Sequence, residues 1–469
     1  MKNPANSLDS LKAKLSEMGP IHFLGVAGSG MRPLAQFAHA CGAVITGSDS
    51  STLPVSMPFP VSHDGSEMAL QQLAQAKTVV FSSAIKGAHP ALQFATSSGK
   101  GLLHRSEFLG LLTAYYKTIS IAGTHGKSTV SALITHILLR TGQEPSWIIG
   151  AAFANGREAF GVGSSNLLVI EADESDGTFL RYHSEIGVIN NVEPDHLDFY
   201  GEFSSLRDMF GKFAATISPT GTCVYLADST DSSMAASYAS CESRGFGCSD
   251  GNAGTLVHWE PRELASLVSV SIFGETVDFH LPLTGRHNAL NALAAILIAE
   301  RVGVMPSTAA ATLEDFPGVS RRLQRYPAKS PLLVFDDYAH NPGKILGCLH
   351  GLRAAFPERR IIAIFQPHRY SRISSLYHEF IRCFAIDNAL VIVLPVYAAG
   401  ESPRPGYSPE DLAAAIATSS GTQTFWAATL KDASNLVKSM ADPLHDVVVT
   451  LGAGDVWTVA ATISGSRAN

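Results

Sequence analysis

The sequence predicts an α/β fold in three domains, in which mainly parallel strands alternate with helices. Short apolar runs followed by helix-length amphipathic stretches recur along almost the whole chain, and this alternation is typical of βαβ units. The length of 469 residues fits three domains of roughly 150 residues each. Polar or proline-containing stretches near 105–117 and 320–330 interrupt the alternation. We therefore predict domains at 1–112, 113–325 and 326–469.

The composition narrows the class of protein. There are 34 Lys and Arg residues against 41 Asp and Glu residues, which gives a formal net charge of −7. Charged residues make up 16% and hydrophobic residues 46%, which excludes a disordered chain. The acidic balance argues against a nucleic-acid partner, because phosphate backbones select basic surfaces. A net negative charge is still compatible with a local basic pocket for a small phosphate ligand.

Three features indicate a cytoplasmic protein without a membrane partner. The six cysteines are scattered and form no Cys-x-x-Cys pair, which favours free thiols in a reducing compartment. Residues 1–20 are polar and lack the apolar core of a signal peptide. No apolar run approaches the length that crosses a bilayer.

The N-terminal block contains a glycine turn of the kind that binds dinucleotides. Its predicted elements are strands at 21–26, 43–46 and 78–81 and a helix at 31–41. The turn Gly25-Val-Ala-Gly28-Ser-Gly30 lies between the first strand and the helix, where glycines let a pyrophosphate approach the backbone. Asp49 follows about 20 residues later, at the usual distance of a ribose-binding acid. Taken alone, this motif would suggest NAD.

The central block contains a phosphate-loop pattern. Its predicted elements are strands at 118–122, 167–170 and 187–190, a helix that ends at Arg140 and another that ends at Arg301. Gly123-Thr-His-Gly126-Lys127-Ser128-Thr129 lies between the first strand and the first helix. In such a loop, Lys127 reaches the β- and γ-phosphates and the Ser128 hydroxyl holds Mg²⁺. Two residues separate the glycines here, whereas the standard Walker spacing has four. A glycine turn with a surface lysine is the alternative interpretation.

Two acidic segments follow later strands of the central block. Glu171-Ala-Asp-Glu-Ser-Asp176 places four carboxylates in six positions, and a cation would relieve their repulsion. Glu171 is expected at a strand end, where it could meet the metal held by Ser128. The second segment, Asn190–Asp198, contains His196 beside carboxylates, and this histidine could bind metal, act as a base or occupy a turn. A solvated acidic loop is the alternative for the first segment.

Further polar side chains lie near the second boundary and in the last block. Asn288 and Asn291 share a helix face and could contact a nucleotide, or they could simply cap the helix. Arg321-Arg322 could clamp a phosphate, or belong to a solvated basic linker. The predicted strands of the last block are at 332–335, 361–365, 389–394 and 447–450. Asp336–Pro342 follows one of these strands and Gln366–Arg372 the next, so their side chains are expected near one another, and Arg369 and Arg372 could pair with a carboxylate.

These motifs, in this order, resemble those of the Mur ligases, the ATP-dependent amide ligases of peptidoglycan precursor synthesis. The matching segments are GVAGSGM, GSD, SSAI, AGTHGKST, EADESDGTFL, NNVEPDHLDFYG, GRHNALNALAA, GVSRRL, DDYAHNP, FQPHRYSR and LGAGD. They extend from residue 25 to 455, and the alanine-adding branch of the family is the most similar. The resemblance implies a Rossmann-like N-terminal domain, a central P-loop ATPase-type domain with a mainly parallel sheet, and a Rossmann-like C-terminal domain. It also implies joining of L-alanine to the carboxylate of UDP-N-acetylmuramate through an acyl phosphate, with ATP and Mg²⁺, by a monomer or homodimer.

The resemblance assigns roles to residues of this chain. The nucleotide sugar would be held by Gly28, Ser29, Gly30, Asp49, Ser83 and Arg105. ATP would be held by Gly123, Thr124, His125, Gly126, Lys127, Ser128, Thr129, Asn288, Asn291, Arg322 and Asp337. The amino acid would be held by Tyr338, His340, Arg369 and Arg372. The metal would be held by Ser128, Glu171 and His196, and the catalytic residues would be Lys127, Glu171 and His196.

The chain departs from the family pattern at a few places. Arg32-Pro33 follow the glycine turn where small residues are usual, and Ser50–His63 is short and proline-rich where relatives have a helix. Asn341 stands where a second histidine is usual, and Ser128 replaces a threonine but keeps the hydroxyl. Phe210 stands where branches with a carbamylated lysine carry that lysine, which fits the alanine-adding branch.

Three other functions remain open on the sequence alone. A recycling ligase of the same family would add a preformed peptide to the same nucleotide sugar. An NAD-dependent oxidoreductase would use the N-terminal glycine turn, although the phosphate loop argues against it. A non-catalytic nucleotide-binding homologue is the third, and the presence of Lys127, Glu171 and His196 argues against it.

Overall fold

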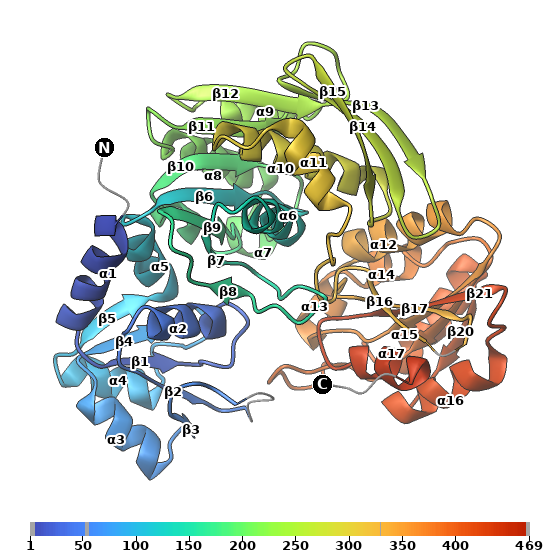
Figure 1. Cartoon of the computed structure of the whole chain (residues 1–469). Helices are drawn as coiled ribbons and strands as arrows, with labels where there is room; N and C mark the ends of the chain where they lie inside the picture. The colour runs from blue at the N-terminus through green and yellow to red at the C-terminus, as the bar shows by residue number, and fades with distance from the viewer. Residues whose placement is uncertain (1–4, 52–55, 329, 466–469) are drawn as a thin grey trace. The chain divides into compact units, whose positions relative to one another are not determined.

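The computed structural model describes residues 5–51, 56–328 and 330–465. It confirms the predicted α/β class with three domains, each built on its own sheet (Figure 1). By internal packing, the chain divides into two compact units. The first comprises 1–260, 267–282 and 286–317, and the second 261–266, 283–285 and 318–469. None of the helices in the described residues is both long and apolar enough to span a bilayer.

The N-terminal domain contains a five-stranded sheet in the order β3-β2-β1-β4-β5, with every neighbouring pair parallel. Its strands are β1 (Ile21–Leu24), β2 (Ile45–Asp49), β3 (Val61–His63), β4 (Thr78–Phe81) and β5 (Gly101–His104). Its helices are α1 (Ala5–Glu17), α2 (Met31–Ala40), α3 (Glu67–Gln75), α4 (Pro90–Ser97) and α5 (Arg105–Thr113). This arrangement is Rossmann-like, because the glycine turn lies between the central strand and α2.

The central domain contains a ten-stranded sheet in the order β15-β14-β13-β12-β11-β10-β6-β9-β7-β8. Its strands are β6 (Lys117–Ala122), β7 (Ser146–Ile148), β8 (Phe160–Gly161), β9 (Leu167–Glu171), β10 (Ser184–Ile189), β11 (Thr222–Leu226), β12 (Glu242–Gly247), β13 (Gly254–Pro261), β14 (Ser266–Ile272) and β15 (Glu275–Leu281). Its α-helices are α6 (Lys127–Arg140), α7 (Leu197–Tyr200), α8 (Phe203–Ala215), α9 (Thr230–Ala236), α10 (Arg286–Arg301) and α11 (Pro306–Leu313), and Thr178–Arg181 forms a 3₁₀ turn. The strands from β13 through β6 to β7 are parallel, which brings the ends of β6, β9 and β10 to one edge.

The C-terminal domain contains a six-stranded sheet in the order β16-β17-β21-β18-β19-β20. Its strands are β16 (Gln324–Tyr326), β17 (Leu333–Asp337), β18 (Arg360–Phe365), β19 (Ala389–Val393), β20 (Gln423–Trp426) and β21 (Asp446–Leu451). Its helices are α12 (Pro342–Ala355), α13 (Tyr370–Ser375), α14 (Tyr377–Arg382), α15 (Pro409–Ser420), α16 (Leu430–Met440) and α17 (Trp457–Ser464). All neighbouring strands are parallel except β16 and β17.

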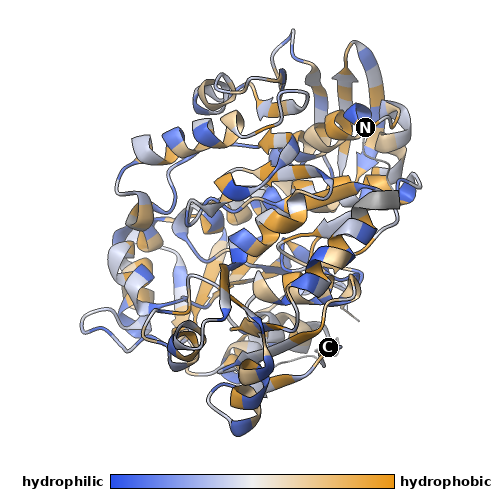
Figure 2. Ribbon diagram, turned by 90° about the vertical axis from the view of Figure 1, so that its left-hand side faces the viewer, coloured by the Kyte–Doolittle hydropathy of each residue, from blue (hydrophilic) through white to orange (hydrophobic). Residues whose placement is uncertain are grey.

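Buried apolar strands hold each domain together. The inner strands β6, β10, β18 and β21 are buried along nearly their whole length, as strands covered by helices on both faces should be. Figure 2 shows apolar residues concentrated in the strands and polar residues on outward-facing helix turns. In the central domain, α6 packs against α10, whose five buried alanines at 289, 292, 294, 295 and 299 permit close packing. This packing fixes the N-terminus of α6, at which the phosphate loop ends.

Some predicted bounds shift for local reasons. The predicted strand 21–26 ends at Leu24, because Gly25 turns the chain with φ +73° and both Gly25 and Val26 donate their N–H groups to the Ser48 carbonyl. The predicted strand 43–46 begins instead at Ile45 and extends to Asp49. Within the proline-rich segment 50–63, residues 52–55 lie outside the described residues, and the described part contains β3.

Candidate active site

The phosphate loop joins the end of β6 to the start of α6, as the sequence predicts. Gly123 and Gly126 have φ of +141° and +81°, in the region that favours glycine. Gly126 is the N-cap of α6, a helix of 14 residues. The N-terminus of a helix of this length attracts anions through its unpaired N–H groups and its dipole. The loop is therefore shaped to receive phosphate.

Lys127 forms a nearly buried ion pair inside the loop. Its Nζ lies 2.8 Å from Oε2 of Glu174 and donates to the Gly123 carbonyl at 2.7 Å. The Glu174 side chain is 0% exposed and the Lys127 side chain 12% exposed. Burial lowers the pKa of Lys127, but Glu174 with Asp173 and Glu171 outweighs burial and raises this pKa. Lys127 is thus held in its charged form within the loop.

Ser128 and Glu171 form a second polar contact at the same edge. The Ser128 hydroxyl donates to Oε2 of Glu171 at 2.8 Å, and the Gly150 N–H donates to the same oxygen at 2.9 Å. A side chain at position 150 would collide with the Glu171 carboxylate, so the glycine lets the carboxylate fit. A hydroxyl and a carboxylate are hard oxygen ligands, which are the ligands that Mg²⁺ prefers.

His196 lies beside Glu174. Its Nε2 is 3.8 Å from Oε1 of Glu174 and 3.9 Å from Oδ2 of Asp195. Ligand atoms of Asp173, Glu174 and His196 all lie within 4.8 Å of one another. The three predicted metal ligands therefore fall into two groups, Ser128 with Glu171 and His196 with Asp173 and Glu174. Burial raises the pKa of Asp173, but Lys127 and other partners outweigh it and hold this pKa below its ordinary value.

The predicted ATP residues Asn288 and Asn291 are linked to the loop through Asn190. Nδ2 of Asn291 donates to Oδ1 of Asn288 at 3.1 Å, and Oδ1 of Asn291 accepts from Asn190 at 3.0 Å. His125 is a residue of the loop itself, and its Nε2 lies 3.3 Å from Oε2 of Glu193. The hydrogen bond from His125 lowers the pKa of Glu193.

The predicted nucleotide-sugar residues gather around the N-terminal glycine turn. Asp49 accepts the Ala27 N–H through Oδ2 and the Ser51 N–H through Oδ1, both at 2.8 Å. Gly28, Ser29 and Gly30 are exposed. A Cβ on Gly30 would lie 3.2 Å from Nη1 of Arg105, so Arg105 borders the turn. The residues thus form one polar surface, in which the glycine turn is exposed, Arg105 is half-buried and Asp49 is buried.

Ser83 lies between this surface and the acidic segment of the central domain. Its hydroxyl donates to Oδ2 of Asp176 at 2.8 Å and contacts Nε2 of His104 at 3.1 Å. The segment that carries Glu171 and Glu174 is therefore tied to a residue of the N-terminal domain.

In the second unit, Asp337 and Arg321 are held by hydrogen bonds, and both arginines of the pair lie near Tyr338. Asp337 accepts the N–H groups of Leu323 and Ala339, each at 2.8 Å. Arg321 donates to Asp336 at 3.1 Å and to the Gly452 carbonyl at 2.6 Å. The guanidiniums of Arg321 and Arg322 lie 5.0 and 5.7 Å from the centre of the Tyr338 ring. The linker residues and the end of β17 thus form one cluster.

The predicted amino-acid residues lie at the ends of β17 and β18. Nδ1 of His340 contacts the Tyr338 carbonyl at 2.7 Å, and Nη1 of Arg372 contacts Nδ1 of His368 at 3.1 Å. Burial, with Arg372, lowers the pKa of His340 to about 3 and that of His368 to about 4. The two histidines are therefore neutral at physiological pH, and the positive charge of the cluster comes from Arg372 and the exposed Arg369.

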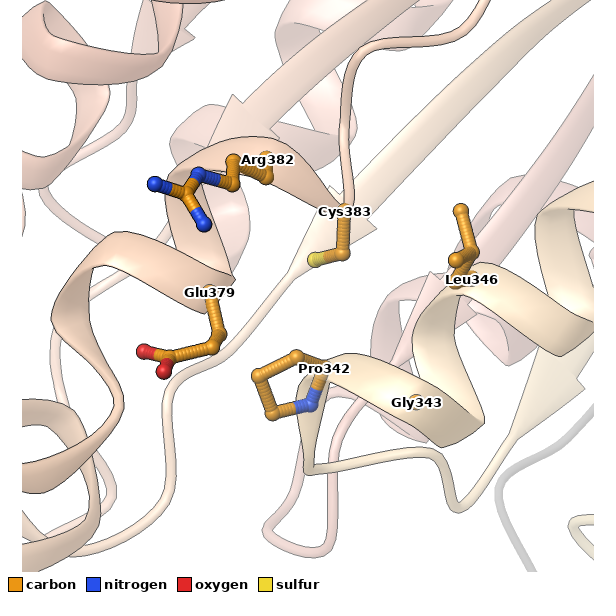
Figure 3. Close-up of a pocket in the computed structure, with 6 residues that line it drawn as sticks. All are labelled: Pro342, Gly343, Leu346, Glu379, Arg382 and Cys383. Atoms are coloured by element: carbon orange, nitrogen blue, oxygen red, sulfur yellow. The ribbon is translucent and has the colours of Figure 1, made fainter.

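Several residues of these clusters received no role from the sequence. Glu174, Asn190, Asn191 and His368 all stand in quoted motifs. Only their position directly after a strand, beside an assigned residue, could have singled them out. A separate cavity of about 210 Å³ in the second unit is lined by Pro342, Gly343, Leu346, Glu379, Arg382 and Cys383 (Figure 3). It contains none of the predicted site residues.

Three family models match the chain in order. They are described as the Mur ligase family catalytic domain at 20–117, the Mur ligase middle domain at 121–299 and the Mur ligase glutamate ligase domain at 321–454. The UDP-N-acetylmuramate–L-alanine ligase of Rubrobacter xylanophilus is 37% identical over 448 residues, covering 93% of this chain and 97% of the relative. The enzyme of the same name from Paenarthrobacter aurescens is 37% identical over 461 residues, covering 95% and 96%.

Solved structures show the same fold. The UDP-N-acetylmuramate-alanine ligase MurC of Thermotoga maritima superposes with a TM-score of 0.79 at 23% identity, covering 95% of this chain and 98% of that one. A murein peptide ligase of Psychrobacter arcticus gives 0.70 at 22% identity, with coverage of 95% and 98%. The MurF ligase of Thermotoga maritima, solved in complex with ADP, gives 0.61 at 15% identity, with coverage of 85% and 90%.

Proposed function

The chain belongs to the Mur ligase family, and on that premise we propose that it joins L-alanine to the carboxylate of UDP-N-acetylmuramate, converting ATP to ADP and phosphate. The observation that carries the ligase chemistry is the nearly buried Lys127–Glu174 pair beside the Ser128–Glu171 contact at the phosphate loop. The choice of substrates is supported by full-length relatives that carry the name UDP-N-acetylmuramate–L-alanine ligase. A cytoplasmic location fits an enzyme that consumes ATP.

Amide formation from a carboxylate needs activation. In the proposed reaction, a carboxylate oxygen of the nucleotide sugar attacks the γ-phosphorus of ATP and displaces ADP. The alanine amine then attacks the acyl carbon, loses a proton and displaces phosphate. Lys127 stabilises the charge on the transferring phosphoryl group. No covalent bond to the protein forms.

The oxygen-rich edge fits a magnesium ion. Ser128 and Glu171 would hold it, and Asp173, Glu174 and His196 form a second group of suitable ligands. When bound, Mg²⁺ neutralises phosphate charge. Meanwhile the loop holds Lys127 in place, and Gly150 orients the Glu171 carboxylate.

The remaining predicted residues take their roles under the same proposal. ATP contacts come from the loop Gly123–Thr129 with Asn288, Asn291, Arg322 and Asp337. The nucleotide sugar is held by Gly28, Ser29, Gly30, Asp49, Ser83 and Arg105. The alanine carboxylate is held by Arg369 and Arg372, with Tyr338 and His340 beside them.

The assay that tests the function combines the purified protein with UDP-N-acetylmuramate, ATP, Mg²⁺ and one amino compound. We expect ADP release only when the nucleotide sugar and L-alanine are both present, with one UDP-N-acetylmuramoyl-alanine formed per ADP by mass spectrometry. The tripeptide L-alanyl-γ-D-glutamyl-meso-diaminopimelate serves as the competing amine. Preference for the tripeptide over L-alanine would instead identify a peptide-recycling ligase. No ADP release with either amine would contradict a ligase altogether.

A further inference from the structure

The phosphate loop lies against the segment that continues β10 beyond its last residue. Ala122 and Ile189 pair at the ends of the parallel strands β6 and β10. Beyond them, the Asn190 N–H donates to the Ala122 carbonyl at 2.9 Å, and the Thr124 N–H donates to the Asn191 carbonyl at 3.1 Å. The pairing therefore continues into the loop itself.

The Asn191 side chain forms hydrogen bonds with both the backbone N–H and the backbone carbonyl of His125. Its Oδ1 accepts the His125 N–H at 2.7 Å, and its Nδ2 donates to the His125 carbonyl at 3.1 Å. A primary amide offers an acceptor and a donor side by side, whereas a carboxylate offers only acceptors. The N–H groups of both Thr124 and His125 thus point to Asn191, which sets the path of the loop before Gly126.

Asn190 connects the same loop to α10. Its Nδ2 donates to the His125 carbonyl and to Oδ1 of Asn291, both at 3.0 Å, and Asn190 is buried. A Cβ on Gly126 would lie 2.5 Å from Nδ2 of Asn190 and 2.8 Å from Oδ1 of Asn291. A Cβ on Gly123 would lie 2.9 Å from Cβ of Asn190. The two loop glycines are therefore required by the asparagines packed against them as well as by their φ angles.

We infer that Asn191 is a positioning residue of the nucleotide site, which acts through the loop and holds Lys127 and the α6 N-terminus for the phosphates of ATP. Asn190 supports it by joining the loop to the helix that carries Asn288 and Asn291. The inference rests on the proposed function, because it assumes that the loop binds ATP. It explains how a loop shorter than the standard spacing keeps one conformation: the neighbouring strand end supplies the bonds.

The test replaces Asn191 by aspartate, which keeps the size and the acceptor for the His125 N–H but loses the donor to the His125 carbonyl. For Asn191→Asp we expect a KM for ATP that rises about 10- to 100-fold, as expected for misplaced groups. The KM values for UDP-N-acetylmuramate and L-alanine should stay within about twofold, because neither proposed site includes the loop backbone at His125. Calorimetric titration of Asn191→Asp with ADP, in which no reaction takes place, should show a similar loss of affinity.

Two further variants complete the test. Asn435→Asp makes the same chemical change at an exposed position of α16 and should leave every constant unchanged. Asn191→Ala removes both hydrogen bonds and should raise the KM for ATP at least as much as Asn191→Asp. An unchanged ADP affinity in folded Asn191→Asp, or an equal rise in all three KM values, would overturn the inference. Loss of the folded state in both Asn191 variants would also overturn it. Wild-type protein that binds ADP but forms no product would refute the proposed function and leave the ADP arm of this test valid.

Discussion

Replacing Lys127 by alanine is expected to lower kcat by at least about 10²–10³-fold, the usual cost of removing one donor aimed at developing charge. Lys127 is the charged group that the loop and Glu174 hold at the start of α6, with Nζ 2.8 Å from the buried carboxylate. In the proposed reaction the ammonium stabilises the transferring phosphoryl group, so its loss should reduce kcat more than it raises the KM for L-alanine. Initial rates of ADP release at saturating substrates measure this effect.

The same change also affects stability, and the two effects can be separated. Removing Lys127 leaves the Glu174 carboxylate buried without its partner, which costs about 3–5 kcal/mol of unfolding free energy. The double variant Lys127→Met with Glu174→Gln removes both charges and should recover most of that stability while staying inactive. Lys212→Ala changes an exposed lysine of α8 and should be fully active. A double variant that is both folded and active at the wild-type rate would contradict this role of Lys127.

Replacing Glu171 by glutamine is expected to raise the Mg²⁺ concentration needed for half-maximal activity by about tenfold or more. The glutamine keeps the size and one acceptor for the Ser128 hydroxyl and the Gly150 N–H, but it removes the negative charge that a hard cation needs. Activity at saturating Mg²⁺ should also fall, because the amide is a poor magnesium ligand.

Titration of Mg²⁺ at fixed ATP, corrected for MgATP, measures this shift. Glu410→Gln makes the same change at an exposed position in the first turn of α15, and its titration should match that of the wild type. If Glu171→Gln followed the wild-type titration curve, Glu171 would not be a magnesium ligand.

The sequence predicted those features that depend on neighbouring residues in the chain. Strand, glycine loop and helix at 118–140 follow from local pattern, and the structure places β6 and α6 there. The proximity of Ser128 and Glu171 could be predicted because Ser128 follows β6 and Glu171 ends β9, and these parallel strands end at the same edge. The strands at 21–26 and 43–46 were correct in kind but misplaced by up to three residues, because the turn at Gly25 and the pairing with β1 decide their ends.

Features that depend on distant contacts could not be predicted. Four carboxylates lie between Glu171 and Asp176, and only the packing of the loop decides that Glu174 turns inward to Lys127 while Asp176 reaches Ser83. The bond between Asn191 and His125 joins residues 66 positions apart. No element was assigned between 242 and 281, where β12–β15 extend the central sheet. For β14 and β15 a local signal was nevertheless present, because apolar and polar residues alternate at 268–272 and 277–281, the pattern of a half-buried strand.

The central claim is that the carboxylate of the nucleotide sugar is activated by phosphoryl transfer from ATP. The most direct test uses UDP-N-acetylmuramate labelled with ¹⁸O in that carboxylate, with ATP, Mg²⁺ and L-alanine, and mass spectrometry of the released phosphate. The oxygen that attacks the γ-phosphorus leaves with the phosphate when the amine displaces it, so each phosphate should carry one ¹⁸O atom. Unlabelled phosphate, or label found in AMP instead, would contradict the account.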